Sequence, residues 1–94
     1  MTEQVAIRTP EIGAGSQTIR VSSWLVDVGE MVNFGDRIVE LLVKGMTFDV
    51  SSPETGLLMR IDRSLDAVVQ PGDILGWLET ADDITLSNEQ GDSP

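Results

Sequence analysis

The stretch from Arg37 to Ser51 reads RIVELLV-KG-MTFDVS, and it indicates the fold more clearly than any other part of the 94-residue sequence. Residues 37–43 are mostly β-branched or aliphatic, as is typical of a strand covered on both faces. Residues 46–51 alternate between apolar and polar, which predicts inward-pointing side chains at Met46, Phe48 and Val50. Two strands joined by two residues that include a glycine predict a β-hairpin with Lys44-Gly45 at its exposed tip.

Outward from this hairpin, the rest of the chain also consists of short apolar runs separated by Gly, Pro and Asp. No stretch keeps helical i, i+3, i+4, i+7 spacing for three turns, so we expect an all-β fold of about eight strands. Ser22-Ser23 interrupts the alternation of one strand and predicts a bulge there. The other expected strands are Val5–Arg8, Thr18–Val26, Met31-Val32, Leu57–Ile61, Ala67–Val69 and Ile74–Thr80.

A repeat of 37 residues relates the two halves of the sequence. It places the segment 28–36 on the segment 65–73, so that Gly35-Asp36 matches Gly72-Asp73. In each copy a strand fragment enters a turn in which glycine supplies a positive φ and aspartate binds backbone N–H groups. The repeat predicts a flattened β-barrel or sandwich (a barrel-sandwich hybrid) of two small antiparallel sheets with quasi-two-fold symmetry.

Chain length allows one domain, which we expect over residues 1–80. Residues 81–94 are polar and acidic and are expected to form a flexible C-terminal tail. The residues expected to be mostly buried are Val21, Val39, Leu41, Phe48, Val50, Leu57 and Leu78.

Composition excludes several functions. The chain contains no cysteine and no histidine, so it lacks thiol nucleophiles, histidine acid–base groups and ordinary zinc or haem ligands. No carboxylate spacing suggests a metal cluster, and we expect neither a metal site nor an active site. A net charge of −10 disfavours nucleic acid and anionic membranes as partners. No signal sequence or membrane-spanning run is visible, so a cytoplasmic protein that is monomeric as an isolated domain is expected.

Lys44 is the only lysine in the chain. A lysine in an exposed turn is commonly an ordinary surface residue. A single accessible amine on a rigid hairpin is also what an acyl-attaching ligase needs, and this makes Lys44 a candidate modification site.

Several motifs, in this order and spacing over residues 5–80, resemble the biotinyl/lipoyl attachment domains. Thr9–Gly13 is similar to the family's Met-Pro-x-Leu-Gly, and Ser23–Val32 to its Trp-Leu-x-x-x-Gly-Asp-x-Val. Thr47–Pro53 resembles Thr-Phe-Glu-Val-Pro-Ser-Pro, Val68–Leu75 resembles the closing Val-x-x-Gly-x-x-Leu, and Ile38–Leu41 resembles the strand before the modified lysine. The run Thr47-Phe-Asp-Val50 is closer to the lipoyl than to the biotinyl members.

The modified lysine is the point at which the sequence departs from this family. The family's lysine lies eight residues before the proline of Ser-Pro, and eight residues before Pro53 stands Gly45. Lys44 occupies the place of the preceding aspartate, and Met46 that of the following alanine.

The resemblance implies a swinging-arm carrier in which lipoate is attached to a turn-tip lysine, here Lys44. It implies lipoyl ligase and 2-oxo-acid dehydrogenase-type enzymes as partners, with Glu40, Asp49 and Glu54 as a candidate acidic recognition face near the tip. An unmodified lipoyl-like structural or interaction module is the alternative, because of the offset lysine. Biotin carriage is a third possibility, suggested by Gly45-Met46. The chain could be a stand-alone carrier or an excised domain.

Overall fold

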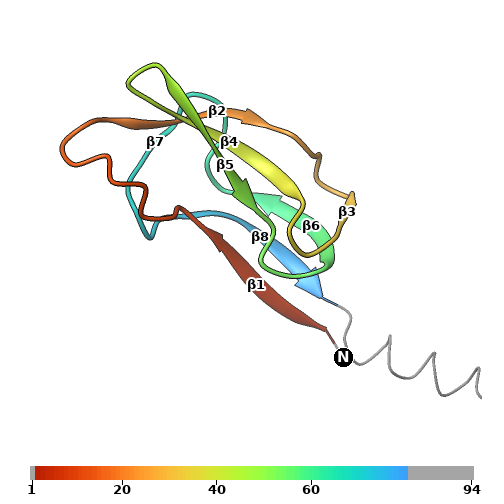
Figure 1. Cartoon of the computed structure of the whole chain (residues 1–94). Coiled ribbons are helices and arrows are strands. Elements are labelled where there is room, and N and C mark those ends of the chain that lie inside the picture. Colours follow the sequence, from red (N-terminus) through yellow and green to blue (C-terminus); the bar gives the residue numbers. More distant parts are fainter. Residues whose placement is uncertain (1, 81–94) are drawn as a thin grey trace, which may run out of the picture.

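The computed structural model describes residues 2–80, which form eight short strands and no helix (Figure 1). The expected tail, residues 81–94, lies outside the described residues. The strands are β1 (Glu3–Arg8), β2 (Ile19–Trp24), β3 (Met31–Val32), β4 (Arg37–Val43), β5 (Met46–Ser51), β6 (Gly56–Ile61), β7 (Val68–Val69) and β8 (Ile74–Thr80). No helix long and apolar enough to cross a membrane is found in this part of the chain.

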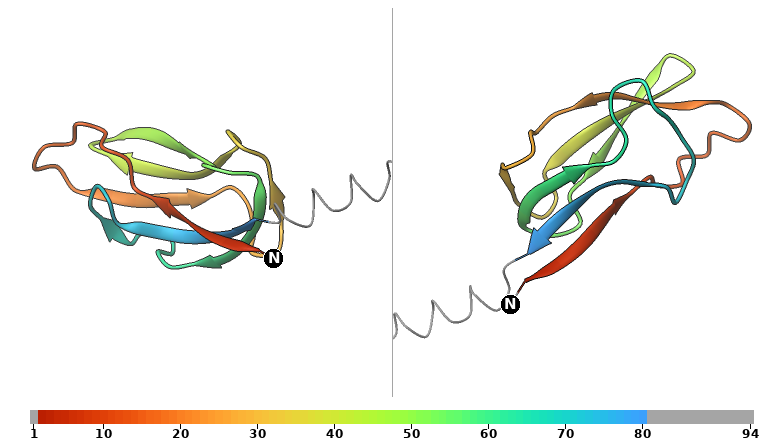
Figure 2. Two further views of the ribbon diagram at one scale, coloured as in Figure 1. Left: turned by 90° about the horizontal axis from the view of Figure 1, so that it is seen from below. Right: turned by 180° about the vertical axis from the view of Figure 1, so that it is seen from behind.

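The strands form two four-stranded antiparallel sheets that pack into a flattened sandwich (Figure 2). Sheet A has the strand order β1-β8-β6-β3, and sheet B has the order β5-β4-β2-β7. Each sheet contains strands from both halves of the sequence, because the chain crosses repeatedly between the sheets. The all-β sandwich predicted from the sequence is therefore confirmed.

The quasi-two-fold symmetry is visible in the strand order. A shift of 37 residues carries β2, β3 and β4 onto β6, β7 and β8, and β1 takes in sheet A the place that β5 has in sheet B. The matching turns also share their hydrogen bonds: the Asn33 N–H donates to Asp36 Oδ2 and the Gln70 N–H to Asp73 Oδ2, both at 2.8 Å. The predicted positive φ is confirmed at both turn glycines, 89° at Gly35 and 91° at Gly72.

The core lies between the sheets and is made of aliphatic side chains from both. Five of the seven residues predicted to be buried are buried: Val21, Val39, Leu41, Val50 and Leu78. Phe48 and Leu57 are only half-buried. Strand β6 begins at Gly56, so its inner positions are Gly56 and Leu58, and Leu57 falls on the outer face.

Two local predictions about the strands have different outcomes. The bulge in β2 is confirmed, because its register with β4 shifts between Val21 and Ser23. The inward position of Met46 is wrong, since this side chain is 61% exposed. Met46 pairs with Val43 beside the turn, at the end of the hairpin and in an edge strand, so little of the opposite sheet covers it.

Candidate functional site

Lys44 and Gly45 form the two-residue turn between β4 and β5, as the sequence predicted. Val43 and Met46 are the last paired residues of the two strands. Both turn residues have positive φ, 51° at Lys44 and 79° at Gly45, which is the backbone of a type I′ hairpin turn. Glycine adopts this conformation without steric cost, whereas lysine adopts it against its intrinsic preference. The turn therefore holds the lysine backbone in an uncommon conformation.

The strands that support this turn are well anchored. Strand β4 lies inside sheet B between β5 and β2, and its Ile38, Val39, Leu41 and Val43 are buried. At the far end of the hairpin, the Ser52 N–H donates to the Asp36 carbonyl at 2.7 Å, and the Gly35 N–H donates to the Ser52 carbonyl at 2.9 Å. Because β4 is a central strand and backbone hydrogen bonds close the far end of the hairpin, the hairpin forms a stiff support for the turn.

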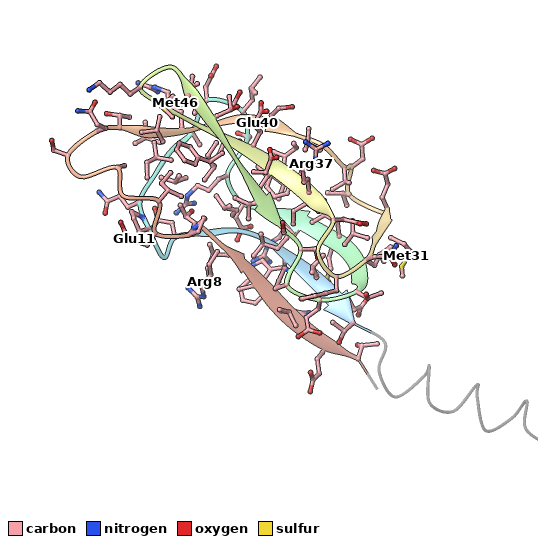
Figure 3. All side chains as sticks on the ribbon, in the orientation of Figure 1. Arg8, Glu11, Met31, Arg37, Glu40 and Met46 are labelled. Carbon is pink, nitrogen blue, oxygen red and sulfur yellow. The ribbon has the colours of Figure 1, made fainter. Side chains whose placement is uncertain are left out.

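The Lys44 side chain is exposed, and it makes no hydrogen bond or ion pair with any of residues 2–80. Beside it lies a shallow hollow of about 330 Å³. The hollow is walled by the hairpin and by the loop before β2; besides Lys44, its lining residues are Ile12, Gly13, Ala14, Gln17, Val43, Met46 and Phe48. Figure 3 labels Met46 at this end of the molecule.

The sequence did not reveal that the loop before β2 reaches the hairpin tip. Ile12 and Ala14 in this loop are partly buried against the core, in a segment otherwise rich in glycine and polar residues. An isolated isoleucine in such a loop is the one signal that could have indicated its return to the body of the domain.

The three acidic residues proposed for a recognition face do not come together. Glu40 and Asp49 are cross-strand partners, and their side chains share the outer face of sheet B. Glu40 Oε1 accepts a hydrogen bond from Ser22 Oγ at 3.3 Å, and Arg37 pairs with Asp49 at 3.3 Å. The placement of Glu54 near the tip is wrong: it follows the far end of β5, beyond Ser51, because β5 runs away from the turn. Figure 3 shows Arg37 and Glu40 along the hairpin.

An ion pair between Arg60 and Asp62 lies elsewhere, at the end of β6 in sheet A. A hydrogen bond from Arg60, at 2.7 Å, is the main cause that lowers the pKa of Asp62, although partial desolvation of the carboxyl opposes it. Trp77 Nε1 donates to the other Asp62 oxygen at 3.1 Å and acts in the same direction as Arg60. Within residues 2–80, no group of three or more Asp or Glu side chains is placed to hold a metal ion.

Comparison with known proteins gives a matching family and several solved structures of similar fold. The family model described as "Biotin-requiring enzyme", of the biotin/lipoyl type, matches residues 5–78. A structure described as a single-chain, multi-domain long-chain acyl-CoA carboxylase matches with a TM-score of 0.67 and 20% sequence identity. That match covers 93% of this chain and 8% of the carboxylase chain. No curated protein matches the sequence.

The family match covers most of the chain and includes the hairpin that ends in Lys44 and Gly45. The similarity to the carboxylase structure supports the same fold, and this chain spans only a small part of that protein. The two sheets, their quasi-two-fold relation and the exposed turn agree with this assignment. The chain therefore belongs to the biotin/lipoyl attachment family, the carrier domains of biotin- and lipoyl-requiring enzymes.

Proposed function

We propose that this domain carries a lipoyl group in amide linkage to Nζ of Lys44 and presents it in turn to the active sites of partner enzymes. One observation carries the proposal. The only lysine of the chain lies at the exposed tip of a stiff hairpin and is free of hydrogen bonds and ion pairs within residues 2–80. An amine in this position can enter the active site of a ligase without any rearrangement of the domain.

The chemistry of attachment requires a primary amine. A lipoyl ligase uses ATP to convert the lipoate carboxyl to a mixed anhydride with AMP, releasing pyrophosphate. The Lys44 nitrogen then attacks the activated carbonyl, AMP leaves, and the amine gives up its proton as the amide forms. The five arginines of the chain cannot replace Lys44, because guanidinium groups stay protonated. Once attached, a lipoyl group supplies a disulfide that can be reduced and acylated.

The residues at the turn fit this group in chemistry but differ from the family pattern in register. The family's lysine position falls on Gly45, the second residue of the turn, whereas the amine of this chain is on the first. One residue along the backbone moves the attachment point by about 3.8 Å and changes its direction. Lys44 nevertheless lies in the same two-residue turn as Gly45, and both residues are exposed to solvent.

The domain itself would contribute position and recognition. Buried β4 and the closed base of the hairpin hold the attachment point at a fixed place relative to the body. The Glu40–Asp49 pair on the outer face of sheet B would give a partner enzyme an acidic surface on the same hairpin. Enzymes of the 2-oxo-acid dehydrogenase type are the partner class that uses a lipoyl arm.

Two other functions have an observation in their favour. The register offset favours an unmodified interaction module, because a ligase that reads the turn closely would reject Lys44. The exposed Met46 beside the turn, together with the carboxylase fold match, favours a biotin arm. The Thr47-Phe-Asp-Val50 run, which is closer to lipoyl domains, leads us to prefer lipoate.

Attachment assays with purified ligases distinguish these functions. The 94-residue chain is incubated with lipoyl ligase, lipoate and ATP, or with biotin ligase, biotin and ATP, and its intact mass is measured. We expect one lipoyl group on the wild type, none on Lys44→Arg, and no biotin on either. If only the double variant Lys44→Asp, Gly45→Lys is lipoylated, the scaffold is a lipoyl domain that its register has disabled, and the interaction module is the correct function.

A further inference from the structure

The outer faces of the two sheets can be compared position by position, because the quasi-two-fold symmetry gives each residue of one sheet a counterpart in the other. Across the outer face of sheet A runs a diagonal row of apolar side chains, one from each strand, which we call the sheet A strip. From β1 to β3 its members are Ala6, Trp77, Leu57 and Met31.

Strand pairing makes the strip continuous. Ala6 is the cross-strand partner of Trp77, and Leu57 is the partner of Met31. Leu57 also pairs with Glu79, which lies two residues from Trp77 on β8, so Leu57 and Trp77 are diagonal neighbours. Side chains in such diagonal positions are within reach of each other when they are long or aromatic. The four side chains therefore form one apolar patch.

The strip is accessible and in part rigid. Met31 is 67% exposed, and the other three residues are half-buried. The Trp77 indole is fixed by its hydrogen bond to Asp62 and by the Arg60 guanidinium, 5.8 Å from the ring centroid. A large aromatic side chain held in place at the surface loses little conformational entropy when a partner covers it.

The corresponding row on sheet B is charged at three of its four positions. These counterparts, in the same order, are Asp49, Glu40, Arg20 and Val68. The two rows share backbone pairing and position in the sheet, so the fold alone does not require apolar residues there. Sheet B shows that charged side chains are compatible with these sites, and the apolar residues of sheet A need a different explanation.

We propose that the sheet A strip is a docking surface for a partner protein that presents apolar side chains surrounded by lysine or arginine. The charge of the chain supports such a partner: it is −10 overall, and the carboxylates of Asp62 and Glu79 border the strip. Two arginines also border the strip: Arg60 is paired with Asp62, and Arg8, on the same face of β1 as Ala6, donates a hydrogen bond to the Gly72 carbonyl. A second copy of the chain would bring the same net negative charge and is a poorer match.

This surface would leave the modification site free. The strip is on sheet A, whereas Lys44 is at the tip of the β4–β5 hairpin of sheet B, at the opposite side of the ribbon in Figure 1. A partner bound to the strip would hold the domain while the tip stays accessible. Docking itself does not depend on the proposed function, because Lys44 takes no part in it.

The two tryptophans provide a direct readout. The uniformly ¹⁵N-labelled 94-residue chain is titrated with a synthetic peptide of alternating leucine and lysine, and amide and indole resonances are followed. The Trp77 indole N–H should shift, together with amides of β1, β6 and β8. The Trp24 indole N–H donates to the Arg63 carbonyl at 2.8 Å and serves as the internal control that should not move. A peptide with glutamate in place of lysine should bind at least about tenfold more weakly.

Variants copied from the other sheet complete the test. Leu57→Arg introduces the residue that sheet B has at the same site, so the fold should accept it, and it should weaken binding about tenfold. Val68 is the sheet B counterpart of Met31, so Val68→Ser is the matched control for Met31→Ser. Val68→Ser should change the affinity for the basic peptide less than about twofold, and Lys44→Arg should leave this affinity unchanged. Shifts centred on sheet B or the turn, no binding of the basic peptide, or self-association of the chain through Trp77 would each overturn the proposal.

Discussion

Replacing Gly76 by alanine tests the close contact between the two central strands of sheet A. Gly76 is buried in β8, where it pairs with Ile61 of β6. A Cβ atom at this position would lie 2.5 Å from the Arg60 carbonyl oxygen and 3.2 Å from Cη2 of Trp24. Ordinary van der Waals contact begins at 3.4 Å, so the strands would have to separate by most of an ångström.

Strand separation on this scale weakens the β6–β8 hydrogen bonds and disturbs the Trp24 side chain. Overpacking a rigid interior typically costs about 1 to 3 kcal/mol, and the atom in the way here is a backbone oxygen, so we expect about 3 kcal/mol. For a domain of this size the loss corresponds to a melting temperature lower by roughly 12 to 24 °C.

Urea denaturation followed by tryptophan fluorescence measures this loss. Gly72→Ala is the control, since Gly72 has a φ of 91° but no atom within 4 Å of its would-be Cβ, and conformational strain alone should cost about 1 to 2 kcal/mol. If Gly76→Ala were no more destabilising than Gly72→Ala, the close packing of β6 on β8 would not be the reason for glycine at position 76.

Three further predictions concern the turns and the Arg60–Asp62 pair. Gly35→Val should lower the free energy of unfolding by more than about 1 kcal/mol, because a β-branched residue is strained at a φ of 89°, and urea denaturation tests this. Asp66→Gly should stabilise the domain by about 0.5 to 1 kcal/mol, since Asp66 has a φ of 70° where the repeat has Gly29; an unchanged urea midpoint would contradict it. Arg60→Gln should raise the pKa of Asp62 in an NMR titration, because it removes the guanidinium that lowers it. A carboxyl with a lowered folded-state pKa stabilises the fold above its unfolded value of about 3.9 and loses this effect as the pH falls through the folded value. The stabilities of wild type and variant should therefore converge as the pH falls below the folded-state pKa of Asp62.

Much of the fold could be predicted from the sequence because its main signals are local. The hairpin at Lys44-Gly45 follows from strand composition and turn chemistry, and the 37-residue repeat predicted both the positive φ of Gly35 and Gly72 and the two-sheet symmetry. The burial that the sequence pattern predicted for Met46 and Leu57 was wrong for a non-local reason. Whether a side chain on the inner face is covered depends on what the opposite sheet places there, and which face a residue takes depends on where its strand begins.

The candidate site was predictable in position but not in surroundings. Lys44 was identified by its uniqueness and its place in the turn. The loop that brings Ile12 and Ala14 to the hairpin lies about 30 residues earlier in the chain, and no local pattern indicates that contact. Glu54 was misplaced because nearness in sequence to the turn was taken as nearness in space, although β5 carries the chain away from the turn at about 3.3 Å per residue. The difference between the outer faces of the two sheets became visible only when strand pairing aligned them.

The mass of the protein isolated from its native host tests the carrier function most directly. Trypsin cleaves after arginine and unmodified lysine, so an acylated Lys44 blocks cleavage between Lys44 and Gly45. We predict an intact mass raised by one lipoyl group and a tryptic peptide that runs uncut from Ile38 to Arg60 and contains that added mass. An unmodified intact mass, with separate peptides 38–44 and 45–60, would contradict the assignment of Lys44 as the attachment site.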